Sequence, residues 1–225
     1  MGKESITGRQ AVLYRAVKGT AIDTGDADNS AWYKVVSIAS TGSVVPSVIK
    51  EGEIYKTAPS GTLTLGSGDE LIPITLTVIC RVDIATTATK GTIDITDSCT
   101  DGFNAYLIDG YTDISGSFTA YLKTDDSTGE LSENAELFLN KCYDIVKMDS
   151  SGTYTRSEQN DDDEILFIEW DKRKTASGNF RQWLILPIII TEVPSDKPLK
   201  GPQNLDVSFM VSQEFKPVIF QEEVA

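Results

Sequence analysis

The chain has 225 residues, of which 40% are apolar and 24% charged, a composition typical of a globular protein with one large or two small domains. It contains no histidine, which excludes histidine-based catalytic triads, general bases and metal sites. The net charge of −14 argues against a basic surface for gripping nucleic acid. No apolar run approaches the ~20 residues that span a bilayer, and the N-terminus lacks a signal-peptide pattern, so we expect synthesis in a cytoplasm and no membrane partner.

Apolar and polar residues alternate with a period of two in three segments, which is typical of antiparallel strands with one wetter face. In the first segment, we expect Thr77, Arg81 and Asp83 to share the polar face, opposite Leu76, Val78, Cys80, Val82 and Ile84. The three segments are Leu76–Ile84, Ile114–Lys123 and Leu205–Ser212. The sequence therefore predicts a mainly β chain.

One segment has helical periodicity instead. Ser132 is placed to cap a helix whose first turn carries Glu133 and Glu136, which is favourable at the positive end of the helix dipole. Apolar residues follow at helical spacing, and we expect this stripe to pack on the sheet. The stripe comprises Ala135, Phe138, Leu139, Cys142 and Val146.

The negative charge is concentrated between Asp125 and Asp171, where 14 acidic residues face only 3 basic ones. We expect this range to be an acidic, helix-containing excursion from a single domain of residues 1–225. Three prolines predict a loop across Val193–Pro202, because proline cannot donate to a central strand. Phe103–Leu107 is compatible with either a strand or a helical turn.

No motif indicates catalysis or cofactor binding. The acidic run Asp161–Glu164 is interpreted as a solvated loop, and the calcium-loop-like start at Asp26–Asn29 lacks the turn glycine and the bidentate glutamate. Three widely spaced cysteines form no CxxC pair and are interpreted as buried structural thiols; they are Cys80, Cys99 and Cys142. We therefore expect neither an enzyme nor a metal or cofactor site.

From about Leu76 to Thr124 the chain resembles the major tail tube proteins of long-tailed bacteriophages. The resemblance rests on the strand Leu76–Ile84, the segment Thr92–Asp97, a short polar loop to Gly102, and the alternating strand after Gly110. A helix after that strand and a hairpin-rich C-terminal part, ending in Leu205–Phe215, also look like this family.

The resemblance implies an antiparallel β-sandwich or barrel-like subunit with one helix packed on its sheet. Such subunits form hexameric rings that stack into a tube, and their strands close one β-barrel around a lumen that conducts DNA during genome ejection. The implied location is the virion tail. The implied partners are other copies of the chain, the tape measure, terminator and distal tail proteins, and passing double-stranded DNA that is not specifically bound. We expect the lumen-facing residues to be Thr77, Arg81, Asp83, Asp94 and Asp113.

Two alternatives stay open at this point. One is another tail component on the same fold, either a tail terminator or the inner tube of a contractile system. The other is a β-sandwich adhesin or surface-binding module whose loops carry the function.

Overall fold

The computed structural model describes residues 12–60, 63–79, 81–94, 106–121, 131–160, 162–175, 178–196, 204–212 and 214–224. The described residues are mainly in strands, with one helix, and the main sheet is antiparallel and curled, which confirms the mainly β prediction. Two compact units divide the chain where the sequence predicts one domain. Unit 1 comprises Met1–Ile79, Glu164–Pro187 and Ser212–Ala225, and unit 2 comprises Cys80–Asp163 and Ile188–Val211.

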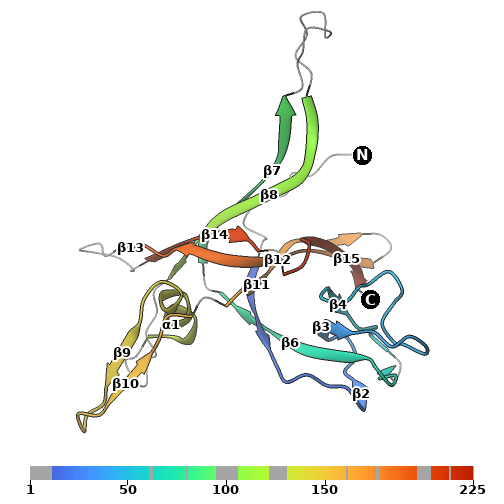
Figure 1. The fold of residues 1–225 in the computed structure, drawn as a ribbon, viewed down its shortest axis with the longest axis horizontal. Coiled ribbons are helices and arrows are strands. Elements are labelled where there is room, and N and C mark those ends of the chain that lie inside the picture. Colours follow the sequence, from blue (N-terminus) through green and yellow to red (C-terminus); the bar gives the residue numbers. More distant parts are fainter. Residues whose placement is uncertain are drawn as a thin grey trace, which may run out of the picture. The chain divides into compact units, whose positions relative to one another are not determined.

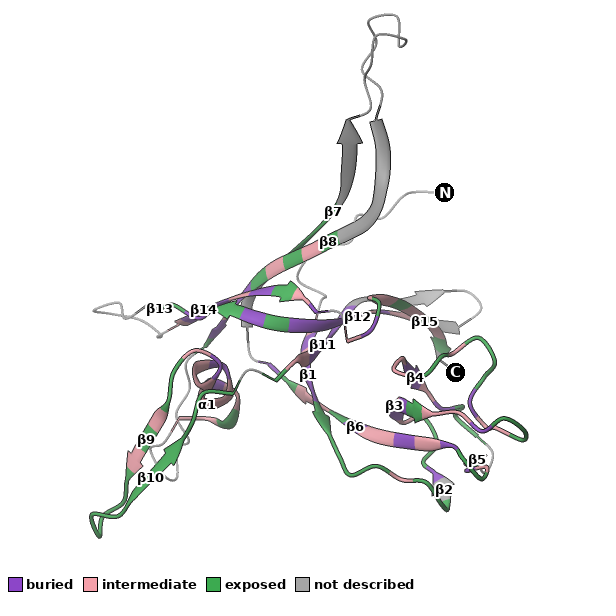
Figure 2. Ribbon diagram, viewed as in Figure 1, coloured by how far each residue is buried: buried purple, intermediate pink, exposed green. Residues whose placement is uncertain are grey.

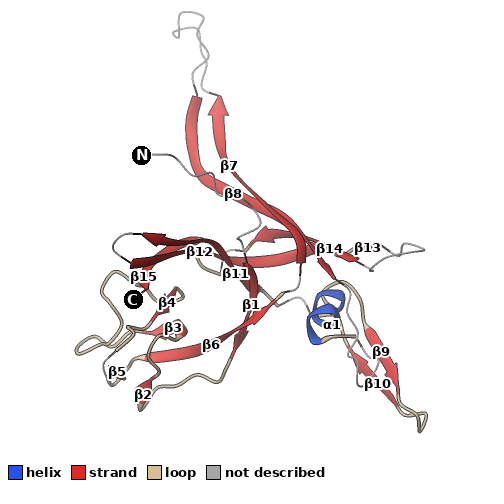
Figure 3. Cartoon of the chain, turned by 180° about the vertical axis from the view of Figure 1, so that it is seen from behind, coloured by secondary structure: helices blue, strands red, loops and turns tan. Residues whose placement is uncertain are grey.

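Unit 1 is built on a sheet whose strands curl around a shared interior (Figures 1 and 3). A separate small pair joins β2 (Asp26–Ala27) to β5 (Leu63–Thr64). The order in the main sheet is β4 (Ile54–Lys56), β3 (Trp32–Ser37), β6 (Glu70–Val78), β1 (Val12–Lys18), β11 (Glu164–Thr175), β12 (Gly178–Glu192, to Pro187 in this unit) and β15 (Val218–Val224).

Aromatic side chains fill the interior of unit 1. The Trp32 ring packs edge-on against Phe167, with centroids 5.0 Å apart, and against Trp183 at 5.7 Å. Strand β11 supplies four consecutive buried residues, Ile165–Ile168, because both of its faces are covered. The predicted acidic excursion is therefore wrong at its C-terminal end: the chain from Glu164 onward pairs with β1 as a central strand.

A second apolar cluster covers the opposite face of β3, β4 and β6. Along β3, Trp32 belongs to the first cluster and Tyr33 to the second, as expected when successive side chains point to opposite faces. Asp69 stands beside this cluster, fully buried just before β6. The second cluster consists of Ala27, Tyr33, Val35, Val45, Tyr55, Leu65 and Leu71.

Unit 2 contains a long hairpin of β7 (Arg81–Asp94) and β8 (Tyr106–Tyr121). Next to β8 lies β14 (Asn204–Val211), followed by the last residues of β12. The predicted loop Val193–Pro202 is wrong at one point, because β13 (Ser195–Asp196) pairs with the start of β14. The alternation predicted for β14 is present: Leu205, Val207 and Phe209 are buried, whereas Asp206 and Met210 are exposed.

The single strand predicted at Leu76–Ile84 is wrong, because two strands divide it. Strand β6 ends at Val78 and β7 begins at Arg81. Between them Ile79 is 2% exposed and its N–H donates to the carbonyl oxygen of Leu13, whereas Val78, predicted to face the core, is 50% exposed. The break has a signal in the sequence: Ile79 is apolar at a position of the predicted polar face, between Thr77 and Arg81, so the alternation is interrupted there.

The helix α1 spans Glu133–Asn140 and is the one helix among the described residues. Ser132 occupies the N-cap position, although its side chain makes no capping hydrogen bond. The chain then forms a hairpin of β9 (Ile145–Met148) and β10 (Tyr154–Ser157), so the prediction that Val146 lies on the helical stripe is wrong; Val146 is 59% exposed on β9.

Candidate functional site

The candidate site is one face of the sheet in unit 2, which we call the hydroxyl face. Directly opposite residues of neighbouring strands share a face, and the register places Ser117 between Ala85 and Ser208. The adjacent row contains Ser115, which pairs with Thr87 and Met210. The hydroxyl face comprises Ala85, Thr87, Ser115, Ser117, Thr191, Ser208 and Met210.

The hydroxyl face contains an open hollow of about 390 Å³, with Gly116 and Phe209 completing its lining. A Cβ atom at Gly116 would lie 2.5 Å from the carbonyl oxygen of Ala85 and 2.5 Å from Cζ of Phe209. Glycine is therefore needed here so that the chain can lie this close to both the β7 backbone and the phenyl ring. The hollow offers hydroxyl donors and acceptors and no charged group among its lining residues.

The surroundings of the hydroxyl face carry acidic charge. Asp113 lies two residues from Ser115 on β8, hence on the same face, and is exposed. Asp206 is exposed on β14 and accepts a 2.7 Å hydrogen bond from the hydroxyl of Thr119. None of the side chains described at these register positions is basic. The face therefore offers no cation to a phosphate group.

On the other face of the hairpin, the described side chains are covered on β8 and exposed on β7. Phe118 and Ala120 of β8 are buried, whereas Thr86 and Ala88 of β7 are exposed. Figure 2 colours the described part of both strands by burial. In the described part of the chain, β8 is the strand that pairs with β7, and the outer edge of β7 has no partner strand. A two-stranded ribbon with both faces wet is only marginally stable by itself.

The structure does not gather the five residues predicted to face a lumen. Thr77 lies on β6 in unit 1, half-buried and paired with Arg15. Arg81 pairs with Ala120 whereas Asp83 pairs with Thr119, and the register shifts between them. The prediction of one regularly alternating polar face through these residues is therefore wrong, because a bulge interrupts the period of two.

The two remaining residues lie on the hairpin itself. Asp94 pairs with Tyr106, beyond a second register shift between Lys90 and Thr92. Asp113 pairs with Thr89 and, among the predicted residues whose side chains are described, it is the one on the hydroxyl face.

The residues predicted to join helix and sheet differ in burial. Ala135 and Phe138 are 2% and 1% exposed. The Phe138 ring packs edge-on against Phe118 of β8, with centroids 5.3 Å apart. Leu139 and Cys142 are only half-buried, so the helix contacts the sheet through a narrower stripe than the sequence predicts.

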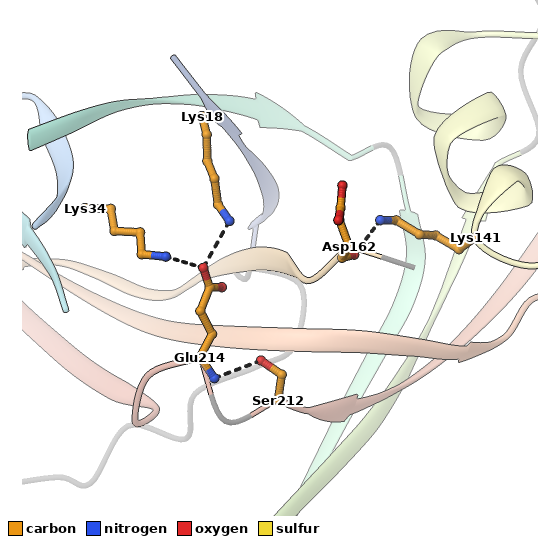
Figure 4. A network of polar contacts seen from close by, with 6 residues as sticks. All are labelled: Lys18, Lys34, Lys141, Asp162, Ser212 and Glu214. Atoms are coloured by element: carbon orange, nitrogen blue, oxygen red, sulfur yellow. Dashed lines mark hydrogen bonds and ion pairs between the residues drawn. The ribbon is translucent and has the colours of Figure 1, made fainter. Parts of the chain in front are cut away.

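Ion pairs in unit 1 form a structural cluster. The carboxylate of Glu214 accepts hydrogen bonds from the amines of Lys18, at 3.1 Å, and Lys34 (Figure 4). Burial by itself would raise the pKa of Glu214, but the hydrogen bonds from Lys34 and Lys18 outweigh it and hold this pKa below its ordinary value. The cluster fastens β1 and β3 to the segment before β15.

Asp69 is the most enclosed carboxylate in the described chain. It accepts hydrogen bonds from backbone N–H groups of Ala39 at 2.8 Å, Val44 at 3.0 Å and Gly66 at 3.2 Å, and from the Ser43 hydroxyl at 2.6 Å. Burial would raise the pKa of Asp69, but these hydrogen bonds together lower it below its ordinary value. Asp69 therefore ties its own loop to the loop between β3 and β4, which supplies three of the four donors, rather than forming an open site.

Metal-binding clusters and membrane-spanning helices are both absent from the described residues. No group of three or more His, Cys, Asp or Glu side chains there is placed to hold a metal ion. No helix in the described ranges is long and apolar enough to cross a membrane. The acidic run Asp161–Glu164 begins outside the described residues, and Asp162 accepts a hydrogen bond from Lys141 through its backbone oxygen (Figure 4).

No family model matches the chain, and no curated protein matches it. The likeness to tail tube proteins therefore stays a prediction, and the function has to be inferred from the geometry of the site. The sequence predicted alternating polar faces on both β8 and β14, but among the residues of this neighbourhood it named Asp113 alone as a site residue and did not predict which residues of β7, β8 and β14 lie beside one another. The signal that would have found Gly116 is a glycine in the middle of a strand, which often marks a close approach of another backbone.

Proposed function

We propose that this chain is a structural subunit of a bacteriophage tail tube, which assembles into stacked hexameric rings in the virion tail. In this proposal the lumen of the rings conducts DNA during genome ejection, and the chain has no catalytic role. The observation that carries the proposal is strand β7 at the end of the sheet: its side chains from Ala85 to Thr89 are exposed on both faces, and its outer edge is unpaired in the described chain.

Ring assembly would satisfy both features of this hairpin. An unpaired edge presents free N–H and C=O groups, and a neighbouring strand pairs with them when the sheet closes into a barrel. The exposed side chains opposite the hydroxyl face, Thr86 and Ala88, would then be covered by the next subunit. A cyclic arrangement repeats this head-to-tail contact until the ring closes.

The hydroxyl face is the part of this hairpin that suits a DNA conduit. Each lysine or arginine contact with a phosphate adds affinity that has to be broken when the duplex slides. Short hydroxyl side chains with Asp113 and Asp206 nearby avoid such contacts and repel phosphate weakly. The end rings would meet other tail proteins such as the tape measure, terminator and distal tail proteins.

The assembly test compares the purified chain with variants at the hairpin. We expect rings or tubes in negative-stain electron microscopy, and a concentration-dependent rise in mass in analytical ultracentrifugation. The variants Thr86→Lys and Ala88→Lys should block assembly while they retain the wild-type circular dichroism melt. The matched control is Val48→Lys, because Val48 is 80% exposed in unit 1.

Three outcomes would contradict the proposal. A monomer that persists at high concentration in several salts would exclude self-assembly. Rings that never stack would favour a terminator, and monomers that bind glycans would favour an adhesin. If tubes form, Asp113→Lys should leave assembly intact but slow DNA ejection, because it adds one cation for every subunit of every ring. Ejection at the wild-type rate would show that Asp113 does not face the lumen.

A further inference from the structure

A second exposed surface lies on the hairpin of β9 and β10 in unit 2. The described residues include twelve large hydrophobic side chains that are exposed, and four of them lie between residues 143 and 154. They are Tyr143, Val146, Met148 and Tyr154, with exposed fractions of 56%, 59%, 62% and 69%. Single exposed apolar residues are ordinary, but a contiguous group of them on one element indicates an interaction surface.

Three of these side chains, Val146, Met148 and Tyr154, lie on one face of the hairpin. Tyr154 pairs with Met148, and Arg156 pairs with Val146, so these three share their face with Arg156. The opposite face carries Lys147, which forms a 2.6 Å ion pair with Glu136 of the helix. The apolar face is therefore turned away from α1, and we call it the hairpin face: Val146, Met148 and Tyr154.

The hairpin is held in one shape by its own contacts. In the turn, the Asp149 carboxylate accepts hydrogen bonds from the N–H groups of Ser151 and Thr153, both at 2.8 Å, and Gly152 adopts a φ of 84°. Arg156 forms an ion pair with Asp144 across the hairpin. A preorganised surface loses little conformational entropy when it binds.

Charge around the hairpin face is strongly acidic. Residues 131–163 include eight acidic and three basic side chains. The three basic side chains are all engaged within this segment: Lys147 with Glu136, Arg156 with Asp144, and Lys141, 7% exposed, with the backbone oxygen of Asp162. Each basic side chain of the segment therefore has a partner within it, although Arg156 on the hairpin face is still 62% exposed. Acidic side chains outnumber the basic ones, and several of the carboxylates are exposed.

We propose that the hairpin face is a docking site for a different protein that presents a basic surface with an apolar centre. A second copy of this chain is the poorer match, because the sequence outside residues 125–171 has 17 basic and 20 acidic residues and no net cationic excess. Apolar contact would supply affinity at the centre, and the acidic surroundings would steer and orient the partner. This inference does not depend on the proposed tube.

The test uses the full chain and fluorescent peptides in anisotropy titrations. The probe is a peptide of alternating lysine and valine, compared with one of alternating lysine and serine and one of alternating glutamate and valine. The double variant Met148→Ser/Tyr154→Ser removes most of the hairpin face. The control Val48→Ser/Ile219→Ser removes two apolar side chains that are 80% and 57% exposed in unit 1.

We expect the lysine–valine peptide to bind wild-type protein and the control equally, and the hairpin double variant about tenfold more weakly, the size of change that one or two anchoring side chains produce. The lysine–serine and glutamate–valine peptides should bind wild-type protein no more tightly than the lysine–valine peptide binds the double variant. If the lysine–serine and lysine–valine peptides bound wild-type protein equally, binding would depend on charge alone, and the proposal would be overturned. Self-association that the double variant abolishes would also overturn it, in favour of a second copy.

Discussion

Strand β11 of unit 1 and strand β8 of unit 2 have similar lengths and opposite surroundings. In β11 four consecutive residues, Ile165–Ile168, are at most 4% exposed, so both faces of the strand are covered. In β8 one face is covered and the other is open: Phe118 is 2% exposed, whereas Asp113, Ser115 and Ser117, which lie on the opposite face, are exposed. In unit 1, β11 is thus buried on both faces over these four residues, whereas in unit 2 β8 has one open face and its neighbour β7 has side chains exposed on both faces.

This difference separates two uses of a β-strand. Where both faces are buried, the strand is part of a self-sufficient core whose cost in conformational entropy is offset by apolar burial. Where a strand continues past its core, its outer residues gain little from folding alone, and their order is stabilised only by binding. Four predictions test whether the two units behave in these two ways.

The largest effect is expected from Phe167→Ala in unit 1. Phe167 is fully buried and its ring contacts both Trp32 and Trp183, so truncation leaves a large cavity. We expect a loss of about 4 kcal/mol in the free energy of unfolding, measured by urea titration with tryptophan fluorescence. All three tryptophans of the chain lie in unit 1, so this signal reports on that unit. A loss below about 1 kcal/mol would mean that unit 1 does not depend on this core.

The second effect is expected from Phe138→Ala in unit 2. Its ring contacts Phe118 and is 1% exposed, so we expect a loss of about 3 kcal/mol for the unfolding of α1. Hydrogen-exchange mass spectrometry of residues 133–140 measures this directly. Half-buried Leu139 provides the comparison, and Leu139→Ala should cost less than half as much. An unchanged exchange rate in Phe138→Ala would place the helix outside the fold of unit 2.

The third effect concerns the close contact at Gly116. Gly116→Ala forces a Cβ against the Ala85 carbonyl and the Phe209 ring, and we expect a loss of about 2 kcal/mol, as for other overpacked sites. Ser117→Ala is the matched control, because Ser117 is the exposed neighbour and should change stability by less than about 0.5 kcal/mol. Equal melting temperatures for the two variants would show that β7 and the Phe209 side chain move aside for the added methyl group at little cost in stability.

The sequence predicts the regular parts of this molecule and misses the irregular ones. The alternation in β14 and at the base of β8 is visible because one face is wet and the other buried. The helix is visible through Ala135 and Phe138, but its end at Asn140 is not, because Cys142 and Val146 continue the helical spacing by coincidence. Strand β11 is hidden in the acidic run because burial on both faces removes alternation.

The candidate site was the least predictable part. Its composition depends on which residues of β7, β8 and β14 lie opposite one another, and register shifts near Arg81 and Lys90 change this pairing. A bulge is a property of two paired strands, so one strand's residue pattern does not contain it. The sequence therefore supplied Asp113 and the serines of β8, and only the register brought Ala85, Thr87 and Ser208 beside them.

The smallest effect is a pH dependence carried by Asp69 in unit 1. Its pKa is lowered in the folded chain, so its contribution to stability is complete above the unfolded pKa of about 3.9 and is lost as the pH falls from there toward the folded pKa. We therefore expect this contribution to decrease as the pH falls below about 4. The pKa of Glu214 is lowered as well, so the effect of Asp69 has to be isolated. The measured quantity is the difference in the free energy of unfolding between wild type and Asp69→Asn, determined by tryptophan fluorescence at each pH. That difference should shrink on acidification, because the variant has no proton to bind at this position. If this difference in unfolding free energy stayed constant from pH 7 to pH 3, the two loops would be held by packing alone. Unit 1 would then be stabilised by apolar contacts, with no contribution from the Asp69 carboxylate.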